Sequence, residues 1–575
     1  MKFSIASRLG HLALAIHMLA ILAVPAAASA PVAAERLEAK VDALFAKWDT
    51  TVSPGCAVAI AKDGKIIYQR GYGMADLEHG VPNSPTTIFH IASVSKQFAA
   101  ASVVLLAQDG KLSLDDEVRK YVPELADFGA PVTIRQLIHH TSGLRDQWDL
   151  LDLAGWRYSH DLITDDDVMH LVTRQRQLNF APNSKYSYSN TGYTLLAQIV
   201  QRVSGQSFRE FTTARIFEPL GMRNSHFRDD FTEIVPNIAY GYRRDGDVFK
   251  TSVTNFNTVG ATSLLTTVQD LLRWDENFYQ PVVGGEALIR QMQQQGVLND
   301  GKQIEYAFGL EVSKYRGLRT VRHSGSDAGY RAQFLRFPEQ HFSVVCLCNA
   351  ADAGPSDRAE SIADIYLEKE LVGAKPRAAA TALTMPAGVR LTKAQSQRVV
   401  GSYLNRDYGG WYRVSQQGDK LQITNQNRSS ELVPLGGNRF LMAGKTASLE
   451  LTFSAPSDRQ AFDRLTVMAR FEEPTPHQRV DEFAPTPAQL SDYVGSYRSD
   501  ELDVAYRVVL EGGALQLQAS KKPADGLQAV TRDLFSGEIG SMQFNRDAAG
   551  RVAGFDLTSG RIKDVRFVRQ SAGSP

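Results

Sequence analysis

The sequence predicts a multidomain protein: one α/β (α+β) domain, with an antiparallel sheet flanked by helices, followed by two small antiparallel β-barrels. Three observations lead to this prediction. The chain has 575 residues, whereas a single domain usually has about 100–200. Its first part mixes helical and strand patterns, as in an α/β or α+β domain of enzyme size. Its last part consists of two similar blocks of short alternating stretches, which indicates a repeated β structure.

Composition and charge exclude several classes of protein. The 63 basic residues balance the 63 acidic ones, and proteins that bind nucleic acid or anionic membranes usually carry a basic excess. Apolar residues make up 43% and charged residues 22% of the chain, which is typical of a globular protein. The three cysteines are too few for a disulfide framework, and no CxxC or HExxH spacing indicates a metal site. We therefore expect a globular protein without metal, other cofactor or nucleic-acid partner.

The first 30 residues have the layout of a secretory signal peptide. Lys2 and Arg8 give a positive start, residues 12–24 are almost entirely apolar, and residues 26–30 are a run of small side chains. The apolar run is shorter than the ~20 residues of a transmembrane helix, and an uncleaved membrane anchor is the less favoured alternative. We expect residues 1–30 to be removed, leaving a secreted protein without a membrane anchor, in the periplasm if the cell has two membranes.

Composition also divides the rest of the chain. Residues 373–389 are rich in Ala and Pro, and residues 474–487 contain four prolines. Both stretches are typical of linkers. The domains that they separate are the α/β domain at residues 35–372, a first barrel at residues 390–473 and a second barrel at residues 488–570.

The two barrels are predicted to be repeats of each other. AQSQRVVGSY in the first block matches AQLSDYVGSY in the second, and two pairs of tyrosines then keep the same offset: Tyr403 with Tyr497, and Tyr412 with Tyr506. Within each block, glycine turns separate stretches in which apolar residues alternate, the pattern of antiparallel strands. Closure into a small barrel removes the exposed edges that such strands would otherwise leave.

The α/β domain is predicted to begin and end with strands of one sheet. Residues 54–72 form a hairpin that turns at an Asp-Gly pair, and residues 330–349 form a second hairpin. Residues 93–108 have the apolar spacing of a helix, with Gly110 just past its end as a C-cap. Residues 355–371 have another helical face. Strands at both ends with helices between them favour one sheet built from both ends of the domain.

The predicted helix at 93–108 opens with Ser93-Val94-Ser95-Lys96. Residues three apart lie on one helical face, so the Ser93 hydroxyl and the Lys96 amine can come within hydrogen-bond reach. A lysine whose pKa is lowered by burial can take the serine proton and activate the oxygen as a nucleophile. The first turn also offers free backbone N–H groups to a negative charge formed there. The alternative is that Ser93 only caps the helix and Lys96 is a solvated surface residue.

Two further motifs have residue types suited to the same chemistry. Tyr188 and Asn190 lie in a polar loop before an apolar helix; a phenol can pass a proton to a leaving group, and an amide can hold a substrate carbonyl. His323 and Gly325 precede the late hairpin, where a glycine lets a substrate backbone approach a strand closely. Taken singly, Tyr188 could be a packed loop aromatic and His323 a strand histidine satisfied by its neighbours.

These motifs, in this order, resemble those of the serine beta-lactamase and penicillin-binding-protein superfamily, on its class C-like branch: Ser-x-x-Lys, then Tyr-x-Asn, then Lys/His-x-Gly. Three other stretches are also similar to that family: TIRQLIHHTSGL, DLLRW and GYRAQFLRFPEQ. The resemblance covers about residues 37–371. It implies that the α/β domain is a beta-lactamase-like catalytic domain.

The resemblance also implies a role for each matching residue. Ser93 would be the acylated nucleophile and Lys96 its general base. Tyr188 would relay the proton to the leaving group, and Asn190 would hold the substrate amide. The backbone N–H groups of Ser93 and Ser326 would form the oxyanion hole, where each donor is worth about 3 kcal/mol.

The third motif departs from the usual pattern of the penicillin-binding proteins, because His323 stands where they have lysine. An ordinary histidine is mostly neutral at pH 7, so we expect weak affinity for substrate carboxylates and inefficient beta-lactamase activity. A His-x-Gly motif ending at Gly325, followed by two barrels, resembles instead the D-stereospecific aminopeptidases. In that group a loop of the last barrel helps to bind the free amine of the substrate. Residues 521–537, with Asp525 or Asp533, are the candidate loop here, unless they form an ordinary solvated turn.

The leading hypothesis is therefore an exported serine hydrolase that forms an acyl-enzyme on Ser93 and cleaves amides or esters of small substrates, with D-amino-acid amides or peptides as the favoured substrates. The alternatives are an esterase, or a D-alanyl-D-alanine carboxypeptidase or beta-lactamase. A different class is a non-catalytic protein that binds cell-wall peptides. The expected partner is a small-molecule or peptide substrate, and a homodimer is left open.

Two other groups of residues are expected to be structural. His139 and His140 point apart on a helix and lack a third ligand, so they do not predict a zinc site. Cys346 and Cys348 alternate on one strand and fit small buried apolar positions. If the first strand pairs with this one, as in the sheet of the family, Cys56 comes near one of them, but cross-strand disulfides are strained and we expect no bond.

Overall fold

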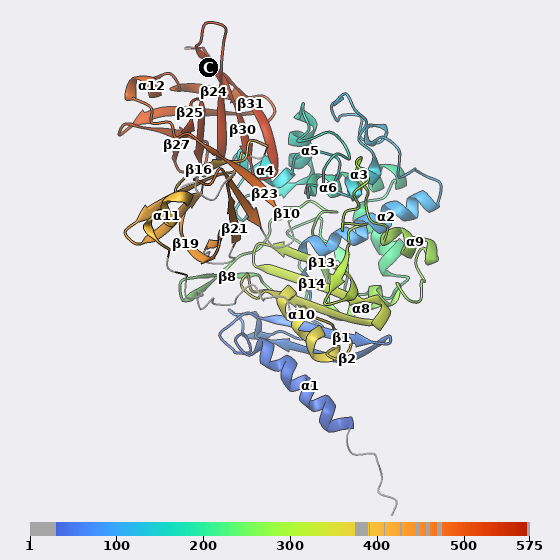
Figure 1. The fold of residues 1–575 in the computed structure, drawn as a ribbon. Coiled ribbons are helices and arrows are strands. Elements are labelled where there is room, and N and C mark those ends of the chain that lie inside the picture. Colours follow the sequence, from blue (N-terminus) through green and yellow to red (C-terminus); the bar gives the residue numbers. More distant parts are fainter. Residues whose placement is uncertain are drawn as a thin grey trace, which may run out of the picture.

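The computed structural model describes residues 30–373, 389, 391–407, 409–425, 428–442, 449–455, 461–468 and 474–571 (Figure 1). The predicted signal peptide, residues 1–30, and the first predicted linker, residues 373–389, therefore lie almost wholly outside the described residues. Within the described ranges, no helix is both long and apolar enough to cross a membrane.

Six antiparallel strands form the central sheet of the α/β domain. Their order is β12 (Glu311–Tyr315), β13 (Leu318–Asp327), β14 (Tyr330–Phe337), β15 (Phe342–Cys348), β1 (Cys56–Lys62) and β2 (Lys65–Tyr72). Every residue of β15 and all but the last of β1 are buried, because both strands lie inside the sheet with both faces covered. The prediction of one sheet built from both ends of the domain is confirmed, and both hairpins form where they were expected.

The two faces of the sheet carry different layers. Val58 and Ile60 face a cluster with α1 (Ala30–Phe45) and α10 (Pro355–Tyr366). Ala57, by the alternation of a strand, faces the larger cluster formed with the other helices. Those helices are α2 (Lys96–Gln108), α3 (Ile134–Ile138), α4 (Gln147–Leu153), α5 (Asp165–Arg174), α6 (Asn190–Ser204), α7 (Phe208–Thr212), α8 (Val268–Glu276) and α9 (Gly285–Met292).

Short strands connect these helices to the sheet. They are β3 (Met74–Asp76) with β4 (Val81–Pro82), β5 (Phe89–His90) with β11 (Leu264–Thr266) and β7 (His226–Phe227), β6 (Ile163–Thr164) with β10 (Phe256–Asn257), and β8 (Tyr242–Asp245) with β9 (Val248–Thr251). The pairing of β11 with β5 matters most for the site, because it places residues 258–263 beside the start of α2.

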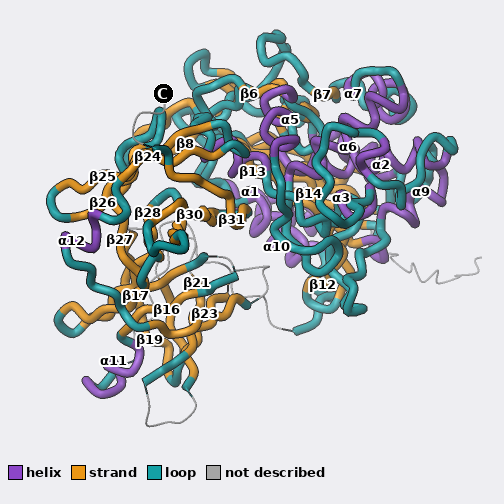
Figure 2. Tube along the Cα trace, turned by 90° about the horizontal axis from the view of Figure 1, so that it is seen from above, coloured by secondary structure: helices purple, strands orange, loops and turns teal. Residues whose placement is uncertain are grey.

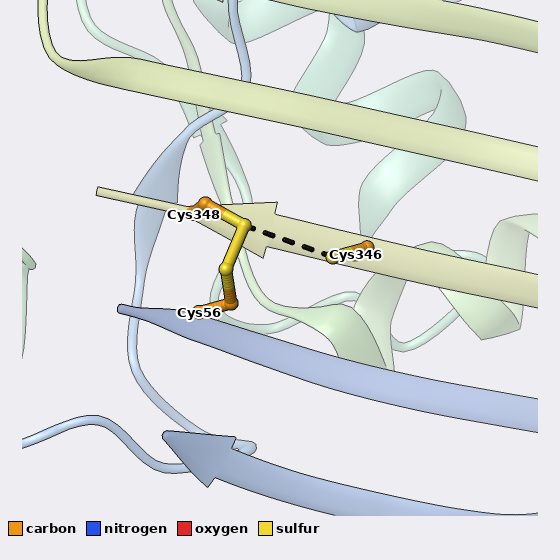
Figure 3. A group of neighbouring side chains, drawn as sticks. All are labelled: Cys56, Cys346 and Cys348. Atoms are coloured by element: carbon orange, nitrogen blue, oxygen red, sulfur yellow. Dashed lines mark hydrogen bonds between the residues drawn. A yellow bond between two sulfur atoms is a disulfide. The ribbon is translucent and has the colours of Figure 1, made fainter. Parts of the chain in front are cut away.

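The cysteines differ from the prediction. Cys56 of β1 and Cys348 of β15 are directly opposite each other in the sheet and form a disulfide (Figure 3). The expectation of no bond was wrong, because the register of β1 on β15, which the sequence does not reveal, brings their Cα atoms to 3.9 Å. Cys346 is a free, fully buried thiol whose sulfur lies 3.7 Å from that of Cys348.

The C-terminal blocks are two closed eight-stranded antiparallel barrels, as predicted. Barrel 1 consists of β16 (Gly401–Leu404), β17 (Trp411–Gln417), β18 (Lys420–Asn425), β19 (Arg428–Gly436), β20 (Arg439–Met442), β21 (Leu449–Ser454), β22 (Arg464–Met468) and β23 (Thr475–Val480). Barrel 2 consists of β24 (Gly495–Ser499), β25 (Val504–Glu511), β26 (Ala514–Gln518), β27 (Asp525–Thr531), β28 (Leu534–Gly537), β29 (Gly540–Arg546), β30 (Val552–Ser559) and β31 (Ile562–Arg569). A short helix precedes each barrel: α11 (Lys393–Val399) and α12 (Pro487–Ser491).

The repeat in the sequence is also a repeat in the structure. Tyr403 pairs with Tyr412 across β16 and β17, and Tyr497 pairs with Tyr506 across β24 and β25. The hydroxyls of Tyr403 and Tyr497 each donate to the backbone carbonyl four residues earlier, at 2.9 and 2.7 Å. Equivalent tyrosines therefore bind each barrel to the segment directly before its first strand.

The second predicted linker, residues 474–487, needs correction. Its first half contains β23, which pairs with β22 and β16 and closes barrel 1. Pro476 lies within β23 opposite Thr466; a proline donates no hydrogen bond, which made this stretch look irregular in the sequence. The connection between the barrels is therefore shorter than predicted.

Barrel 2 packs tightly against the α/β domain, whereas none of the described residues of barrel 1 belongs to that core. One hydrophobic cluster contains side chains of the helices together with side chains of barrel 2, whereas barrel 1 has a cluster of its own. The Tyr506 hydroxyl donates to the Leu153 carbonyl at 2.5 Å, and Arg145 forms a buried ion pair with Glu501 at 2.6 Å. Figures 1 and 2 show both barrels on one side of the α/β domain, with β30 and β31 next to it.

Replacing Cys348 with Ser should lower the free energy of unfolding by about 2–5 kcal/mol, because the bond then no longer restricts the unfolded chain. The bond joins residues 292 apart in the sequence. Denaturant unfolding measures the change, and Cys346→Ala, which keeps the bond, is the control. Thiol titration of the denatured wild-type protein should give one thiol before reduction and three after; three before reduction would contradict the assignment.

Candidate active site

The serine of the first motif lies on a short 3₁₀ turn, Ala92–Ser95, that leads directly into α2. Side chains three residues apart are eclipsed in a 3₁₀ turn, and the Lys96 amine lies 3.0 Å from the Ser93 hydroxyl oxygen. Ala92 has a φ of +50°, a strained value for a residue with a side chain that is common at functional sites. The predicted helix is therefore present, and its tighter first turn brings the serine and the lysine together.

Lys96 has three oxygen neighbours and no access to solvent. Its Nζ lies 3.0 Å from Ser93 Oγ, 2.8 Å from Asn190 Oδ1 and 2.7 Å from the carbonyl oxygen of Ala261. The side chain is completely buried. The alternative interpretation of Lys96 as a solvated surface residue is wrong.

The charged groups around Lys96 have opposite effects on its pKa, and burial has the largest effect. Burial lowers the pKa of Lys96 from its usual value near 10.5 to about 7, although the carboxylates of Asp327 and Asp146 act to raise it. The guanidinium of Arg561 acts in the same direction as burial. About half of the lysine is therefore an uncharged amine at pH 7. That amine can donate its two hydrogens to Asn190 and Ala261 and present its lone pair to the Ser93 hydroxyl.

Tyr188 lies against the same pair of residues. The Lys96 Nζ lies 4.9 Å from the centre of the Tyr188 ring, and the Ser93 side chain is close enough to act on the pKa of the Tyr188 phenol, which it lowers. Burial raises the pKa of Tyr188 well above its usual value, so the residue remains a neutral phenol with a proton to give. His140 packs on the ring with centroids 4.2 Å apart and accepts a hydrogen bond from the Ser189 backbone N–H.

The two neighbouring histidines, His139 and His140, have different structural roles. His140 is fully enclosed, and burial holds its pKa well below the usual value. His139 contacts the Gln294 carbonyl and the ring of Phe308 instead. The predicted structural role of both histidines is confirmed: His140 supports the loop of the second motif, and His139 packs in the core.

Asn190 is hydrogen-bonded to Asp146, a residue that the sequence motifs did not identify. Asp146 Oδ2 accepts hydrogen bonds from the Asn190 backbone N–H at 2.6 Å and from its side-chain Nδ2 at 2.9 Å. The other amide atom, Oδ1, contacts Lys96. Both side-chain atoms of Asn190 are thus occupied by the protein. In this structure Asn190 orients Lys96, and binding of a substrate amide by Asn190 stays a prediction.

The third motif lies beside this group but does not present a charge to it. Burial lowers the pKa of His323 to about 3, with the nearby Lys96 acting in the same direction. Its Nδ1 lies 2.6 Å from the Ser324 carbonyl, which can only accept, so Nε2 accepts from the Tyr306 hydroxyl at 2.9 Å. His323 is therefore neutral, and both ring nitrogens have protein partners. Direct contact of this ring with substrate stays a prediction.

Gly325 has a structural role that the sequence did not predict. A Cβ at this position would lie 2.3 Å from the Ile91 carbonyl oxygen and 3.2 Å from Ala92 Cβ. The glycine thus allows β13 to approach the protein's own nucleophile turn, and the close approach of a substrate backbone to this strand stays a prediction. Ser326 follows on the same strand, and its N–H stays the predicted second donor of the oxyanion hole.

Asp327 fixes the end of β13 to the residues that contact Lys96. Its carboxylate accepts hydrogen bonds from Tyr158 and Thr262 and lies 2.9 Å from His90 Nε2. Thr262 follows Ala261, whose carbonyl contacts Lys96. This buried carboxylate therefore joins the strand of the third motif to the segment behind the lysine.

The predicted amine-binding loop of barrel 2 does not supply a free acid. Asp533 is paired with Arg546 and accepts from Tyr493, and Asp525 accepts from backbone N–H groups at Glu538 and Ile539, all within barrel 2. Binding of the substrate amine by Asp525 or Asp533 stays a prediction. A different loop approaches the site.

That loop is the β30–β31 turn, and its side chain is a cation. Arg561 donates from Nη2 to Asp146 Oδ1 at 2.8 Å and from Nε to Asp149 Oδ2 at 3.3 Å. Asp146 has a weak signal in the sequence, since an aspartate before an apolar run is typical of a helix N-cap, which it is for α4. Arg561 has none beyond its place after a turn glycine.

A serine in contact with a buried lysine and a neutral phenol, set between an antiparallel sheet and a group of helices, defines the class as a serine hydrolase. The family model described as "Beta-lactamase" matches residues 38–367. The chain belongs to this family, and the resemblance read from its motifs is confirmed. The alternative of a non-catalytic cell-wall binder is thereby set aside.

The relatives extend the similarity beyond the catalytic domain. The chain is 28% identical over 514 residues to a D-aminopeptidase of Gluconobacter oxydans, covering 87% of this chain and 90% of that one. It is 26% identical to a D-aminopeptidase of Brucella anthropi, covering 90% and 95%. It is 30% identical to penicillin-binding protein 4* of Bacillus subtilis, covering 69% and 89%. A solved penicillin-binding-protein homologue from Pyrococcus abyssi shares the fold, with a TM-score of 0.54, 24% identity, and coverage of 77% and 99%.

The rate at which Ser93 is acylated should fall as pH falls through about 7. Lys96 has its pKa lowered to about 7, and protonation below that value removes the lone pair that accepts the serine proton, so each further pH unit should cost about tenfold. Labelling by a fluorophosphonate, timed by intact mass between pH 5 and 9, gives the profile. A flat profile, or a midpoint above 9, would contradict the assignment of Lys96 as the base.

The close approach at Gly325 makes a second prediction. Gly325→Ala should push β13 away from the nucleophile turn and slow labelling of Ser93 by about 10–100-fold, since displacements near 1 Å cost that much. Ser324→Ala is the control, because Ser324 is an exposed neighbour on the same strand. Equal labelling rates in the two variants would show that the contact with Ile91 has no part in the geometry of the site.

Proposed function

We propose that the protein is an exported hydrolase that cleaves small D-amino-acid amides and peptides through an acyl-enzyme on Ser93. The observation that carries this proposal is the contact between the Ser93 hydroxyl and the buried amine of Lys96. The other residues of the site contribute to the steps of the reaction and to the choice of substrate.

In the first step the Ser93 oxygen attacks the substrate carbonyl carbon and its proton passes to the Lys96 amine. The carbonyl oxygen becomes an oxyanion, for which the backbone N–H groups of Ser93 and Ser326 are the proposed donors. Tyr188 gives its proton to the leaving nitrogen or oxygen as that bond breaks, and Lys96 returns a proton to Tyr188. Water then attacks the acyl-enzyme through the same groups in reverse, which releases the acid and restores Ser93.

Two observations support D-amino-acid amides over other substrates. The neutral His323 offers no fixed charge to a carboxylate, which disfavours penicillins and peptide C-termini. The D-aminopeptidase relatives also match about nine-tenths of this chain, a span that includes the barrels. An esterase activity uses the same steps with a better leaving group, and the substrate panel below separates the two.

Export is supported by two features. The first 30 residues have the layout of a signal peptide. The Cys56–Cys348 disulfide is of a kind that persists in oxidising compartments such as the periplasm.

The test compares hydrolysis of D- and L-alanine p-nitroanilide, p-nitrophenyl acetate and nitrocefin by the wild-type protein and by Ser93→Ala. We expect the D-anilide to exceed the L-anilide in kcat/KM by at least about tenfold, nitrocefin to be slowest, and every rate to be lost in the variant. Faster hydrolysis of nitrocefin than of the D-anilide would overturn the substrate assignment. Activity that survives in Ser93→Ala would overturn the nucleophile.

A further inference from the structure

The turn between β30 and β31 is inserted into the catalytic domain rather than laid on its surface. The Arg561 backbone N–H donates to Asp149 at 2.8 Å, and its carbonyl accepts from Asn179 Nδ2 at 2.8 Å. Lys563, near the start of β31, is held as well, since its N–H donates to Asn179 Oδ1 at 2.8 Å. The backbone of this turn is therefore fixed from both sides.

A buried ion pair secures the same region of the interface. Arg145 precedes Asp146, its side chain is fully buried, and it contacts Glu501 of barrel 2 at 2.6 Å. Arg145 also donates to the backbone carbonyls of Lys563 and Asp564, at 2.7 and 3.1 Å. The position of the Arg561 side chain is thus determined by how barrel 2 docks.

From Arg561 a continuous series of hydrogen bonds leads to the nucleophile. Arg561 Nη2 contacts Asp146 Oδ1 at 2.8 Å, and Asp146 Oδ2 contacts Asn190 Nδ2 at 2.9 Å. Asn190 Oδ1 contacts Lys96 Nζ at 2.8 Å, and Lys96 contacts Ser93 Oγ at 3.0 Å. Every side chain between Arg561 and Ser93 in this series is buried.

We propose that Arg561 of barrel 2 is a positioning residue of the active site: acting through Asp146 and Asn190, it holds the Lys96 amine on Ser93 and favours its uncharged form. The inference rests on Ser93 as the nucleophile of the proposed function. It goes further in making the base of the catalytic domain depend on a side chain from another domain.

The electrostatic reason lies in the charge of Asp146. Left unpaired, this buried carboxylate would favour the lysine cation; the guanidinium neutralises it and itself repels that cation. The titratable and charged groups that face Lys96 are Asp146, Asp327, Arg561, Tyr188, Tyr193, His140 and His323. The two histidines and two tyrosines are neutral because they are buried. Asp327 has partners of its own, so Arg561 is the group that balances Asp146.

The same contacts exclude a simpler role for Arg561 as a surface cation. Asp149 shares the guanidinium, and burial raises the pKa of Asp149 while Asp146 acts in the same direction. One cation thus compensates two closely spaced carboxylates. Its removal would leave like charges together beside the base, and the effect would pass to Lys96 through Asn190.

The test is the pH profile of Ser93 labelling by a fluorophosphonate in Arg561→Ala, Arg561→Gln and Arg561→Lys, all in the full-length protein. Loss of the charge in the Ala and Gln variants should move the midpoint upward by about one pH unit, so that labelling at pH 6 is about tenfold slower. Arg561→Lys keeps the charge and should restore at least half of the shift. Arg561→Gln serves if the Ala variant loses the docked barrel, which limited proteolysis would show.

Lys522→Ala is the matched control. Lys522 also joins barrel 2 to the catalytic domain, through an ion pair with Asp152 at 2.6 Å, but it is not part of the series that leads to Asn190. The labelling profile of Lys522→Ala should therefore have the same midpoint as that of the wild-type protein. Folded Ala and Gln variants with the wild-type midpoint would overturn the proposal for Arg561, whatever their rates. Absence of labelling in the wild-type protein would instead overturn the proposed function, and the two failures are therefore distinguishable.

Discussion

The chemistry of this protein depends on burying one amine against one hydroxyl. A lysine in water is almost wholly protonated at pH 7 and cannot accept a proton from serine. Enclosing Lys96 brings its pKa to about 7, within reach of the working pH. The Ala261 carbonyl and the Asn190 amide compensate part of the cost of burial by accepting its hydrogen bonds. The other residues of the site exclude water from Lys96 and orient its amine toward the Ser93 hydroxyl.

The sheet supplies the orientation. The nucleophile turn and the strand of the third motif are far apart in sequence, and they meet because β13 passes directly over Ile91 and Ala92, where only a glycine fits at position 325. Pairing of β1 with β15 joins the two ends of the domain, and the Cys56–Cys348 bond makes that closure covalent. The site is thus positioned by contacts between residues far apart in the sequence, and these contacts are already formed without substrate.

Local patterns were enough to predict the elements and most of the site. Alternating apolar residues and glycine turns identified both hairpins and both barrels, and two short motifs identified Ser93, Lys96, Tyr188 and Asn190, which the structure brings together. What could not be predicted depends on register and docking. The disulfide needs the alignment of Cys56 with Cys348, and the contact of Arg561 with Asp146 joins residues 415 apart. The end of barrel 1 was also missed, because β23 contains a proline, a residue that usually interrupts strands, and still pairs with β22.

The two barrels descend from one pattern, yet they relate differently to the catalytic domain. Barrel 1 keeps a hydrophobic core of its own, whereas barrel 2 shares one with the helices around the site. A shared apolar core makes docking favourable and rigid, and rigidity is what a hydrogen-bonded series such as Arg561–Asp146–Asn190 requires, because each contact fails if its neighbour shifts by about 1 Å. Barrel 1 contacts barrel 2 instead, through a small apolar cluster that includes Trp411 and Leu534. Under the proposal for Arg561, sharing the core is therefore the structural condition that lets barrel 2 hold this side chain against Asp146.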